Sequence, residues 1–426
     1  MERKNNYPFI LVSGMFSYGE EEGLSKLFPY FGWWKTDVRK LFAGMGVECY
    51  NPSSGPFSSA WDKACEVYAA LLGKTVDYGK AHSEKHGHAR YGRTYEKALL
   101  PDWGKVDENG NVNKVNLFGY SFGAPTERML TTLLYLGSEE ERAVTPEDEL
   151  SDLFKGGHTD WIHSITSASG TNNGSTFVYA LESLKLLNAT LTAVYGMGSL
   201  LSHTPMSKVL DFRLDHFGVT KKPSAKNLSF KIEGKNVKTV VNSEDNMFYD
   251  LMPHRAQELN EQLDIFDNIY YISYSGCCTK ETLGVDLPSK YTWKFPVFFP
   301  SALATGLYKS KRNDDNRIPI DSSWGANDGI CNVKSSQYPL DEPYRHISSL
   351  SEEIKPGVWN VMPIEYSKTH MSYTGIGEKN LDFTNFFADI YNRVSSLETI
   401  DSAKVLEYPQ APIANEEQEK MLKKHK

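Results

Sequence analysis

The feature that most constrains this chain is a serine between two glycines, in Gly119-Tyr120-Ser121-Phe122-Gly123. A strand-like run, VNLFG, ends at the first glycine, and a helix-like run, APTERMLTTLLYL, follows the second. A serine on such a strand-to-helix turn has a strained backbone, and small neighbours relieve the crowding. The pattern predicts a nucleophile elbow, with the hydroxyl at the carboxyl edge of a sheet and the positive end of a helix beside it. The alternative is a serine that only turns the chain.

Strand-like and helix-like segments alternate along the rest of the chain. Stretches rich in β-branched and aromatic residues alternate with amphipathic stretches, which is typical of an α/β sheet. The expected strands are 8–13, 47–50, 115–119, 161–167, 269–274 and 358–366. The expected helices are 33–42, 60–72, 124–136 and 383–394. We expect one α/β domain over 1–408 and a flexible, charged tail at 409–426.

A serine needs a base to become a nucleophile, and the α/β-hydrolase order places an acid and then a histidine after the serine. His370 follows the strand-like VWNVMPIEYS and precedes a glycine-containing loop. Asp328 lies upstream, in the turn Asn327-Asp328-Gly329. Each signal alone also fits a surface histidine or an ordinary turn. Their joint order predicts a triad of Ser121, Asp328 and His370.

Two backbone amides are expected to bind the oxyanion that forms during acyl transfer. One belongs to the residue after the nucleophile, Phe122, and the other to the loop after an early strand. Ser13-Gly14-Met15-Phe16 ends the first strong strand, so Met15 is the expected second donor. The alternative is that Gly14 serves only a tight turn.

Three histidines, His82, His86 and His88, lie close together in the segment 61–103. Imidazole and carboxylate groups bind zinc, and tetrahedral closure needs four of them. His82 and His88 with one or two distant acids satisfy that requirement. An exposed histidine-rich loop without metal is the alternative, because the spacing does not match H-E-x-x-H.

Four stretches match a known family. They are FSSAWDKACEVYAALLGKTVDYGKAHSEKHGHARYGRTY at 57–95, WGANDGI at 324–330, FYDL at 248–251 and DFRLDHFG at 211–218. From about Tyr7 to Leu397, the chain resembles the zinc-containing, thermoalkalophilic bacterial lipases. The resemblance implies an α/β-hydrolase fold, in which helices flank a mostly parallel central sheet. It also implies a zinc-pinned subdomain at about 57–100 and a helical lid within 174–250.

The resemblance assigns the same triad and the same two oxyanion donors. It further implies four zinc ligands and leaves out His86 and Asp77. The implied ligands are Asp62, His82, His88 and Asp250. Four protein ligands leave no open position for water, so the expected zinc is structural.

The chain departs from the family at three sites. In the elbow, the family's first small residue and the histidine that follows it are replaced by Gly119 and Tyr120. The usual oxyanion segment, H-G-F-x-G, is replaced by Ser13-Gly14-Met15-Phe16-Ser17. The acidic ligands of the family's calcium site, shortly after the catalytic histidine, correspond to Ser372 and Gly377. Calcium binding is therefore not predicted, although Glu378 is an acid beside these positions.

The segment 174–204 has apolar residues at helical spacing, interrupted by Gly196 and Gly198. It matches the family's lid region, and the glycines are expected to give it hinge freedom for covering and exposing an apolar cleft. The alternative is a plain core helix.

Composition and charge limit the classes of molecule that this chain is expected to bind. The net charge is −8, and no lysine-rich stripe interleaves with aromatic residues, so nucleic acid is not an expected partner. No run approaches the roughly 18 apolar residues of a membrane span, and no signal peptide pattern opens the chain. The five cysteines are expected to be free thiols. We expect the mature form of a secreted protein that meets its ester or lipid substrate at an interface and needs no obligate protein partner.

The predicted function is a serine carboxylester hydrolase, a triacylglycerol lipase or esterase that forms an acyl-enzyme intermediate. A polyesterase that cleaves aliphatic or aliphatic-aromatic polyesters with the same machinery is the alternative. Two other classes compete: a catalytically silent hydrolase fold, and zinc-dependent hydrolysis at the histidine cluster. The ordered triad disfavours the first, and a closed four-ligand zinc site disfavours the second.

Overall fold

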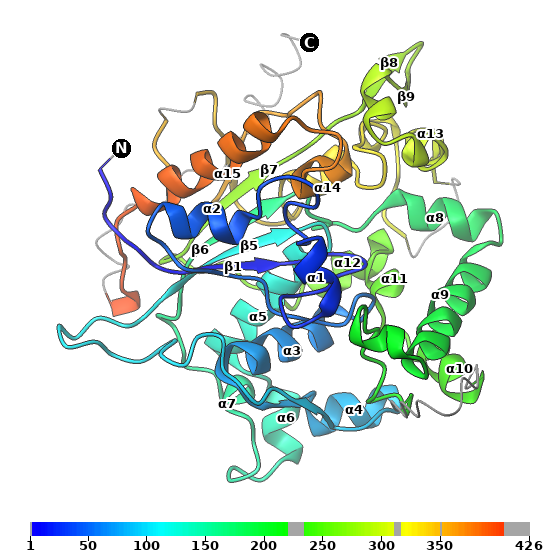
Figure 1. Ribbon diagram of the computed structural model, residues 1–426. Helices are drawn as coiled ribbons and strands as arrows, with labels where there is room; N and C mark the ends of the chain where they lie inside the picture. Colours follow the sequence, from blue (N-terminus) through cyan, green and yellow to red (C-terminus); the bar gives the residue numbers. More distant parts are fainter. Residues whose placement is uncertain (1, 220–233, 311–316, 350–351, 404–426) are drawn as a thin grey trace.

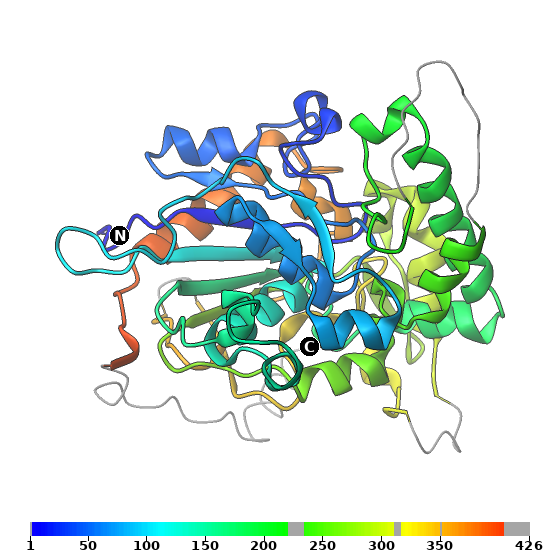
Figure 2. The ribbon, with the colours of Figure 1, turned by 90° about the horizontal axis from the view of Figure 1, so that it is seen from below.

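The computed structural model describes residues 2–219, 234–310, 317–349 and 352–403. The expected tail at 409–426 and part of the expected lid region, 220–233, lie outside the described residues. A sheet of seven strands runs through the centre, and helices cover both of its faces (Figure 1, Figure 2).

All neighbouring strands of the central sheet are parallel. In spatial order they are β10 (Tyr344–His346), β11 (Trp359–Val361), β7 (Tyr270–Tyr274), β6 (Ile162–Ala168), β5 (Val115–Tyr120), β1 (Phe9–Val12) and β2 (Cys49–Tyr50). Parallel strands bring all their carboxyl ends to one edge, where ligands of open α/β sheets bind. This confirms the expected α/β architecture with a mostly parallel sheet.

Each expected strand is present, with one clear difference in length. The strand expected at 358–366 is only Trp359–Val361, because Pro363 has no amide hydrogen with which to continue the ladder. The sequence does not indicate β10, an edge strand of three residues with the sequence YRH.

Two pairs of helices sandwich the sheet. Helices α2 (Val38–Gly44) and α15 (Asn380–Ser395) pack on one face, and α3 (Ala60–Leu72) and α5 (Gly123–Leu136) pack on the other. Alternate residues of β1 pack on opposite faces of the sheet. Phe9 and Leu11 belong to one apolar core, and Ile10 and Val12 belong to the other. Burial on both faces explains why the strand is apolar throughout.

Helix α2 starts later than expected, at Val38 instead of residue 33. The Asp37 side chain accepts a hydrogen bond of 3.0 Å from the Arg39 amide and so caps the helix. Trp33 has a φ of +41°, which is incompatible with a right-handed helix.

The remaining elements surround the sheet. The other helices are α1 (Gly23–Leu27), α4 (Lys80–His86), α6 (Glu139–Val144), α7 (Asp152–Lys155), α8 (Thr176–Ser183), α9 (Leu187–Ser202), α10 (Gly234–Asn242), α11 (Met247–Asp250), α12 (Pro253–Asn260), α13 (Phe299–Leu307) and α14 (Val333–Gln337). The short 3₁₀ helices are η1 (Pro205–Lys208), η2 (Lys290–Lys294), η3 (Pro296–Phe298), η4 (Ser322–Trp324) and η5 (His370–Thr374). Two antiparallel pairs complete the set, β3 (Thr75–Asp77) with β4 (Tyr91–Thr94) and β8 (Thr279–Thr282) with β9 (Val285–Pro288).

The expected lid segment forms α8 and α9, which lie to one side of the sheet (Figure 1). Helix α9 continues without a break through Gly196 and Gly198, so the expected hinge is not found at these glycines. A Cβ at Gly198 would lie 2.5 Å from the Phe212 ring, whereas a Cβ at Gly196 would meet no atom within 4 Å. Gly198 therefore serves close packing. No helix within the described ranges is both long and apolar enough to cross a bilayer.

One buried histidine makes the fold sensitive to acid. His163 lies in β6, and a hydrogen bond of 3.1 Å joins its Nε2 to Asn5 Nδ2 in the N-terminal segment. Burial, with a smaller contribution from Lys114, lowers the pKa of His163 to about 3. The imidazole is therefore neutral in the folded chain and titrates near its usual pKa of about 6.5 when the chain unfolds.

We predict that the free energy of unfolding falls as the pH drops below about 6.5 towards 3. In this range His163 binds a proton in the unfolded chain but stays neutral in the folded chain. The slope for this one proton is at most about 1.4 kcal/mol per pH unit. Urea unfolding of the wild type and His163→Gln at pH 7 and pH 5 measures it. Equal losses of stability in the two proteins over this interval would contradict the assignment.

Candidate active site

Ser121 lies between β5 and α5, at the carboxyl edge of the sheet. Its φ is +58°, a left-handed conformation that is strained for a residue other than glycine. The flanking glycines make room for this turn. A Cβ at Gly119 would lie 2.6 Å from the carboxyl carbon of Glu127, and a Cβ at Gly123 would lie 2.0 Å from the Val12 carbonyl oxygen. The elbow expected from the pentapeptide is therefore present, and contacts explain both glycines.

The structure brings together the three residues that the sequence places far apart. His370 Nε2 lies 2.8 Å from Ser121 Oγ, and His370 Nδ1 lies 2.8 Å from Asp328 Oδ2. Because an ionised carboxylate only accepts hydrogen bonds, Nδ1 carries the proton and Nε2 is free to accept one from the serine. All three side chains are buried.

Hydrogen bonds fix the positions of Asp328 and His370. Asp328 Oδ1 accepts from the amides of Ile330 and Cys331, at 3.1 and 2.8 Å. The His370 amide donates to the Asp328 carbonyl oxygen at 2.8 Å, and the Tyr120 hydroxyl donates to the His370 carbonyl oxygen at 2.9 Å. Tyr120 thus holds the loop that carries His370.

The loop after β1 runs directly against the elbow. A Cβ at Gly14 would lie 2.6 Å from the Ser121 Cβ, so only glycine permits this approach. The next residue is Met15, and Phe122 precedes α5. Within the described residues, the amides of Met15 and Phe122 have no backbone acceptor. The expected role of these two amides as oxyanion donors stays a prediction.

A cavity of about 440 Å³ opens above Ser121 and His370, and its walls are almost entirely apolar. The wall includes Met15, Tyr30, Trp33, Leu210, Met247, Leu251, Phe295, Val297, Phe298, Ile330 and Met371. In the part of the chain that the structure describes, α8 and α9 contribute no wall residue. The role of these helices as a lid therefore stays a prediction.

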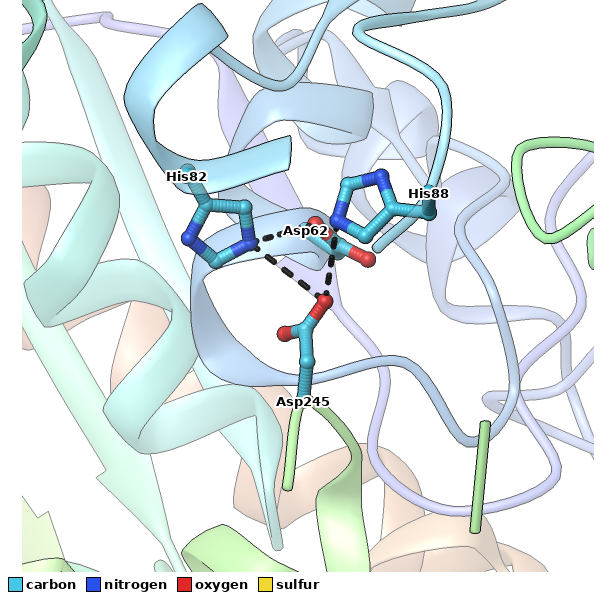
Figure 3. Close-up of side chains that lie close together, drawn as sticks. All are labelled: Asp62, His82, His88 and Asp245. Carbon is cyan, nitrogen blue, oxygen red and sulfur yellow. Dashed lines mark ion pairs between the residues drawn. The ribbon is translucent and has the colours of Figure 1, made fainter. Parts of the chain in front are cut away.

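A second cluster of polar side chains lies on the α3 side of the molecule (Figure 3). Asp62 of α3, His82 of α4, His88 and Asp245 point their ligand atoms at one another, all within 4.8 Å. His82 Nε2 lies 3.3 Å from Asp62 Oδ1 and 3.4 Å from Asp245 Oδ2, and His88 Nε2 lies 3.2 Å from Asp245 Oδ2. These four atoms are buried and have no hydrogen-bond partner among the described residues.

The cluster fits a tetrahedral metal ion. Ligand atoms about 2.0 Å from a tetrahedral centre are separated by roughly 3.3 Å. The three ion-pair distances of 3.2, 3.3 and 3.4 Å agree with this separation, and all pairs of ligand atoms lie within 4.8 Å. Buried polar atoms without hydrogen-bond partners are rare in folded proteins and call for a ligand. His86, which was left out of the ligand set, instead contacts the Ser243 carbonyl oxygen at 2.8 Å.

The fourth member differs from the prediction, because the cluster contains Asp245 where Asp250 was expected. Asp245 precedes Asn246, the N-cap of α11, and faces His82. Asp250 lies one turn later and accepts a hydrogen bond of 2.8 Å from the Ala60 amide at the start of α3. Burial and the nearby acids raise the pKa of Asp250 to about 7. Two aspartates five residues apart on either side of a helix cap are not distinguished by sequence pattern.

His216 supports the cluster and was missed by the sequence reasoning. Its Nε2 lies 3.0 Å from Asp62 Oδ2, the oxygen that faces away from the other ligands. Such outer contacts orient metal ligands. The stretch DFRLDHFG contains this histidine, so its match to the family was the available signal.

The position considered for calcium is occupied by cationic side chains. Glu378 accepts hydrogen bonds from Lys294 Nζ at 2.7 Å, Lys368 Nζ at 3.4 Å and Ser372 Oγ at 2.7 Å. Two ammonium groups already neutralise the carboxylate, whereas calcium requires several oxygen ligands. This donor set does not fit calcium.

A family model described as "Lipase-like, C-terminal domain" matches residues 5–404, nearly the whole chain. The chain belongs to this bacterial lipase family. A lipase of Staphylococcus epidermidis is 32% identical over 374 residues, which cover 87% of this chain and 50% of the relative. Lipase 1 of Staphylococcus aureus is also 32% identical and is covered over 51% of its length. The chain therefore spans about half the length of these curated relatives.

Three solved structures are similar to this chain over nearly the full length of both chains. The Staphylococcus hyicus lipase has a TM-score of 0.78 at 30% identity, covering 92% of this chain and 96% of that one. EstA from Clostridium botulinum has a TM-score of 0.77 at 33% identity, covering 94% and 90%. Lipase 1 from Pelosinus fermentans has a TM-score of 0.74 at 33% identity, covering 92% and 99%.

The difference between Asp245 and Asp250 gives a sharp test of the cluster. We predict that Asp245→Asn abolishes metal binding, because it removes an anionic ligand. Asp250→Asn retains the metal, because the Asp250 carboxylate accepts a backbone hydrogen bond outside the cluster. Elemental analysis of both variants, purified without chelator, measures the metal content. Loss of metal in Asp250→Asn with retention in Asp245→Asn would overturn the assignment.

Proposed function

We propose that this lipase-family chain is a serine carboxylester hydrolase that acts on acylglycerols and related esters. The observation that carries the proposal is the continuous contact from Ser121 to His370 to Asp328, at 2.8 Å for each step, beneath an apolar cavity. The four-residue metal cluster contributes no wall residue to this cavity within the described residues. The nucleophile is therefore assigned to the serine, and metal-dependent hydrolysis is not favoured.

The geometry supports an acyl-enzyme mechanism. Ser121 Oγ attacks the ester carbonyl carbon while His370 Nε2 accepts the hydroxyl proton, and the Asp328 carboxylate stabilises the imidazolium. The amides of Met15 and Phe122 bind the oxygen that becomes negative. The alkoxide leaves with the proton from His370. Water then attacks the acyl-enzyme with the same histidine as base, releasing the acid and restoring Ser121.

We assign zinc to the Asp62, His82, His88 and Asp245 cluster. Two carboxylates and two neutral imidazoles match zinc's preferred donors and give an uncharged site. Bound there, the metal supplies a structural cross-link, because all four positions are taken by protein. Helix α4, in which only Ser83 is buried, and the segments that carry His88 and Asp245 would be held to α3 by this link.

The surface around the cavity supports an insoluble substrate. Phe16 and Val297 line the cavity and are also exposed, at 46% and 74%. Exposed Trp34 packs against Trp33 of the cavity wall, with ring centroids 5.3 Å apart. An apolar rim of exposed side chains gains free energy when it enters a lipid surface.

The triad is tested by Ser121→Ala, Asp328→Asn and His370→Ala. We expect each variant to lose ester hydrolysis by about a thousandfold or more while remaining folded, and the effects should not add, because the residues act as one unit. Initial rates on a soluble short-chain ester and thermal unfolding measure activity and folding. Ser121→Ala that keeps most of the wild-type rate would refute the mechanism.

The apolar rim predicts a selective loss on insoluble esters. Trp34→Ser with Val297→Ser should lower hydrolysis of emulsified triacylglycerol more than that of a soluble short-chain ester, since each apolar side chain that enters the lipid contributes roughly 1–3 kcal/mol. Leu283→Ser is the matched control, because Leu283 is fully exposed but does not line the cavity. A solid aliphatic polyester is a third substrate for comparison. Equal losses on all substrates would show that the rim does not bind the interface.

A further inference from the structure

The loop that carries Met15 is strained. Phe16 has a φ of +55°, a left-handed conformation that is unfavourable for a bulky side chain. Phe16 directly follows the proposed oxyanion donor, so the direction of the Met15 amide depends on this turn. A strained turn persists only where its surroundings hold it.

Two neutral hydrogen bonds hold the outer part of this loop. The Tyr30 hydroxyl donates to the Met15 carbonyl oxygen at 2.8 Å. The Phe16 amide donates to the Pro56 carbonyl oxygen at 3.2 Å. Both link the loop to neighbouring chain segments, but each is a single bond between uncharged groups.

The inner side of the loop contacts a buried lysine. Lys63, on α3, is fully buried, and its Nζ donates to Ser17 Oγ at 3.0 Å, Ser54 Oγ at 2.9 Å and the Gly55 carbonyl oxygen at 2.9 Å. The Ser17 hydroxyl in turn donates to the Ser54 carbonyl oxygen at 3.1 Å. All three N–H groups of the ammonium are used, and they join two loops to one rigid helix.

A buried ammonium is costly to desolvate, so its presence needs an explanation. Its acceptors are two hydroxyl groups and a carbonyl oxygen, and a carboxylate lies on the other side of the same loop. Glu66 accepts a hydrogen bond from the Gly55 amide, while Lys63 binds the Gly55 carbonyl oxygen. The loop around Gly55 is thus held by hydrogen bonds to two buried side chains of α3, and Ser17 is bonded to one of them.

We propose that Lys63 is a positioning residue for catalysis, which holds the loop of Ser17, Phe16 and Met15 so that the Met15 amide points at the oxyanion. The proposal rests on the proposed function. Lys63 does not touch the substrate, because it is absent from the cavity wall within the described residues. It acts on the transition state, where the oxyanion develops, more than on the bound ester.

This role has a kinetic signature. Lys63→Met keeps an apolar chain of similar length and removes the charge and all three hydrogen bonds. We expect kcat on a soluble ester to fall by about 10- to 100-fold with KM changed little, as for a misplacement of roughly 1 Å. The inhibition constant of a boronic acid, whose anionic adduct with Ser121 places an oxygen in the oxyanion position, should rise by a similar factor.

The matched control is Lys114→Met. Lys114 is another buried lysine, bonded to Asp160 Oδ1 at 2.9 Å and to the Ile400 carbonyl oxygen at 2.8 Å, near the start of β5 and far from its carboxyl end. Its loss should lower the thermal unfolding temperature without lowering kcat. Lys63→Met with an unchanged kcat and only a lower unfolding temperature, like the control, would overturn the proposal.

Ser17→Ala keeps the test decisive if Lys63→Met does not fold. It removes one acceptor of Lys63 and leaves the lysine in place, and kcat should fall several-fold while the boronic acid binds correspondingly less tightly. Unchanged kcat and boronic acid affinity in Ser17→Ala would also overturn the proposal. Failure of the proposed function looks different, because the wild type would then lack serine-dependent ester hydrolysis altogether.

Discussion

Close contact between backbones at the carboxyl edge of β1 and β5 is the constraint on which the site depends. Gly123 lies against the Val12 carbonyl, and Gly14 lies against Ser121. Any side chain at either glycine would push β1 away from the elbow. Because the backbones touch, a nucleophile from one strand and an amide from the loop of the next occupy one small volume without further adjustment.

Buried polar groups also connect segments that lie outside the central sheet. The Asp62, His82, His88 and Asp245 cluster joins α3, α4 and the segment before α11, and His216 adds the segment after η1. Lys63 is the residue after Asp62, so successive residues of one helix face the proposed metal site and the loop of Ser17 and Met15. Helix α3 therefore connects the Asp62, His82, His88 and Asp245 cluster to the loop of Ser17 and Met15 and fixes their relative positions.

Much of this arrangement follows from local sequence, for reasons that particular residues show. The elbow was predictable because the close contacts at positions 119 and 123 permit only glycine, which gives the pattern G-x-S-x-G around Ser121. The strands were predictable because burial on both faces makes them apolar. The choice of Asp245 over Asp250 was not predictable, since it depends on which side of a helix cap each carboxylate faces. The late start of α2 and the network of Lys63 likewise depend on contacts between segments that are distant in sequence.

The order of strands in the sheet has a consequence for how the chain becomes active during synthesis. Ser121 follows β5, but His370 follows β11, which joins the sheet beyond β6 and β7. The chain emerges from the ribosome from its N-terminus, so the nucleophile is made some 250 residues before its base. A partly made chain can shape the elbow but cannot place an imidazole beside it. The ester hydrolysis proposed for this chain therefore cannot begin until nearly the whole sheet exists, and its appearance would report the end of folding rather than its beginning.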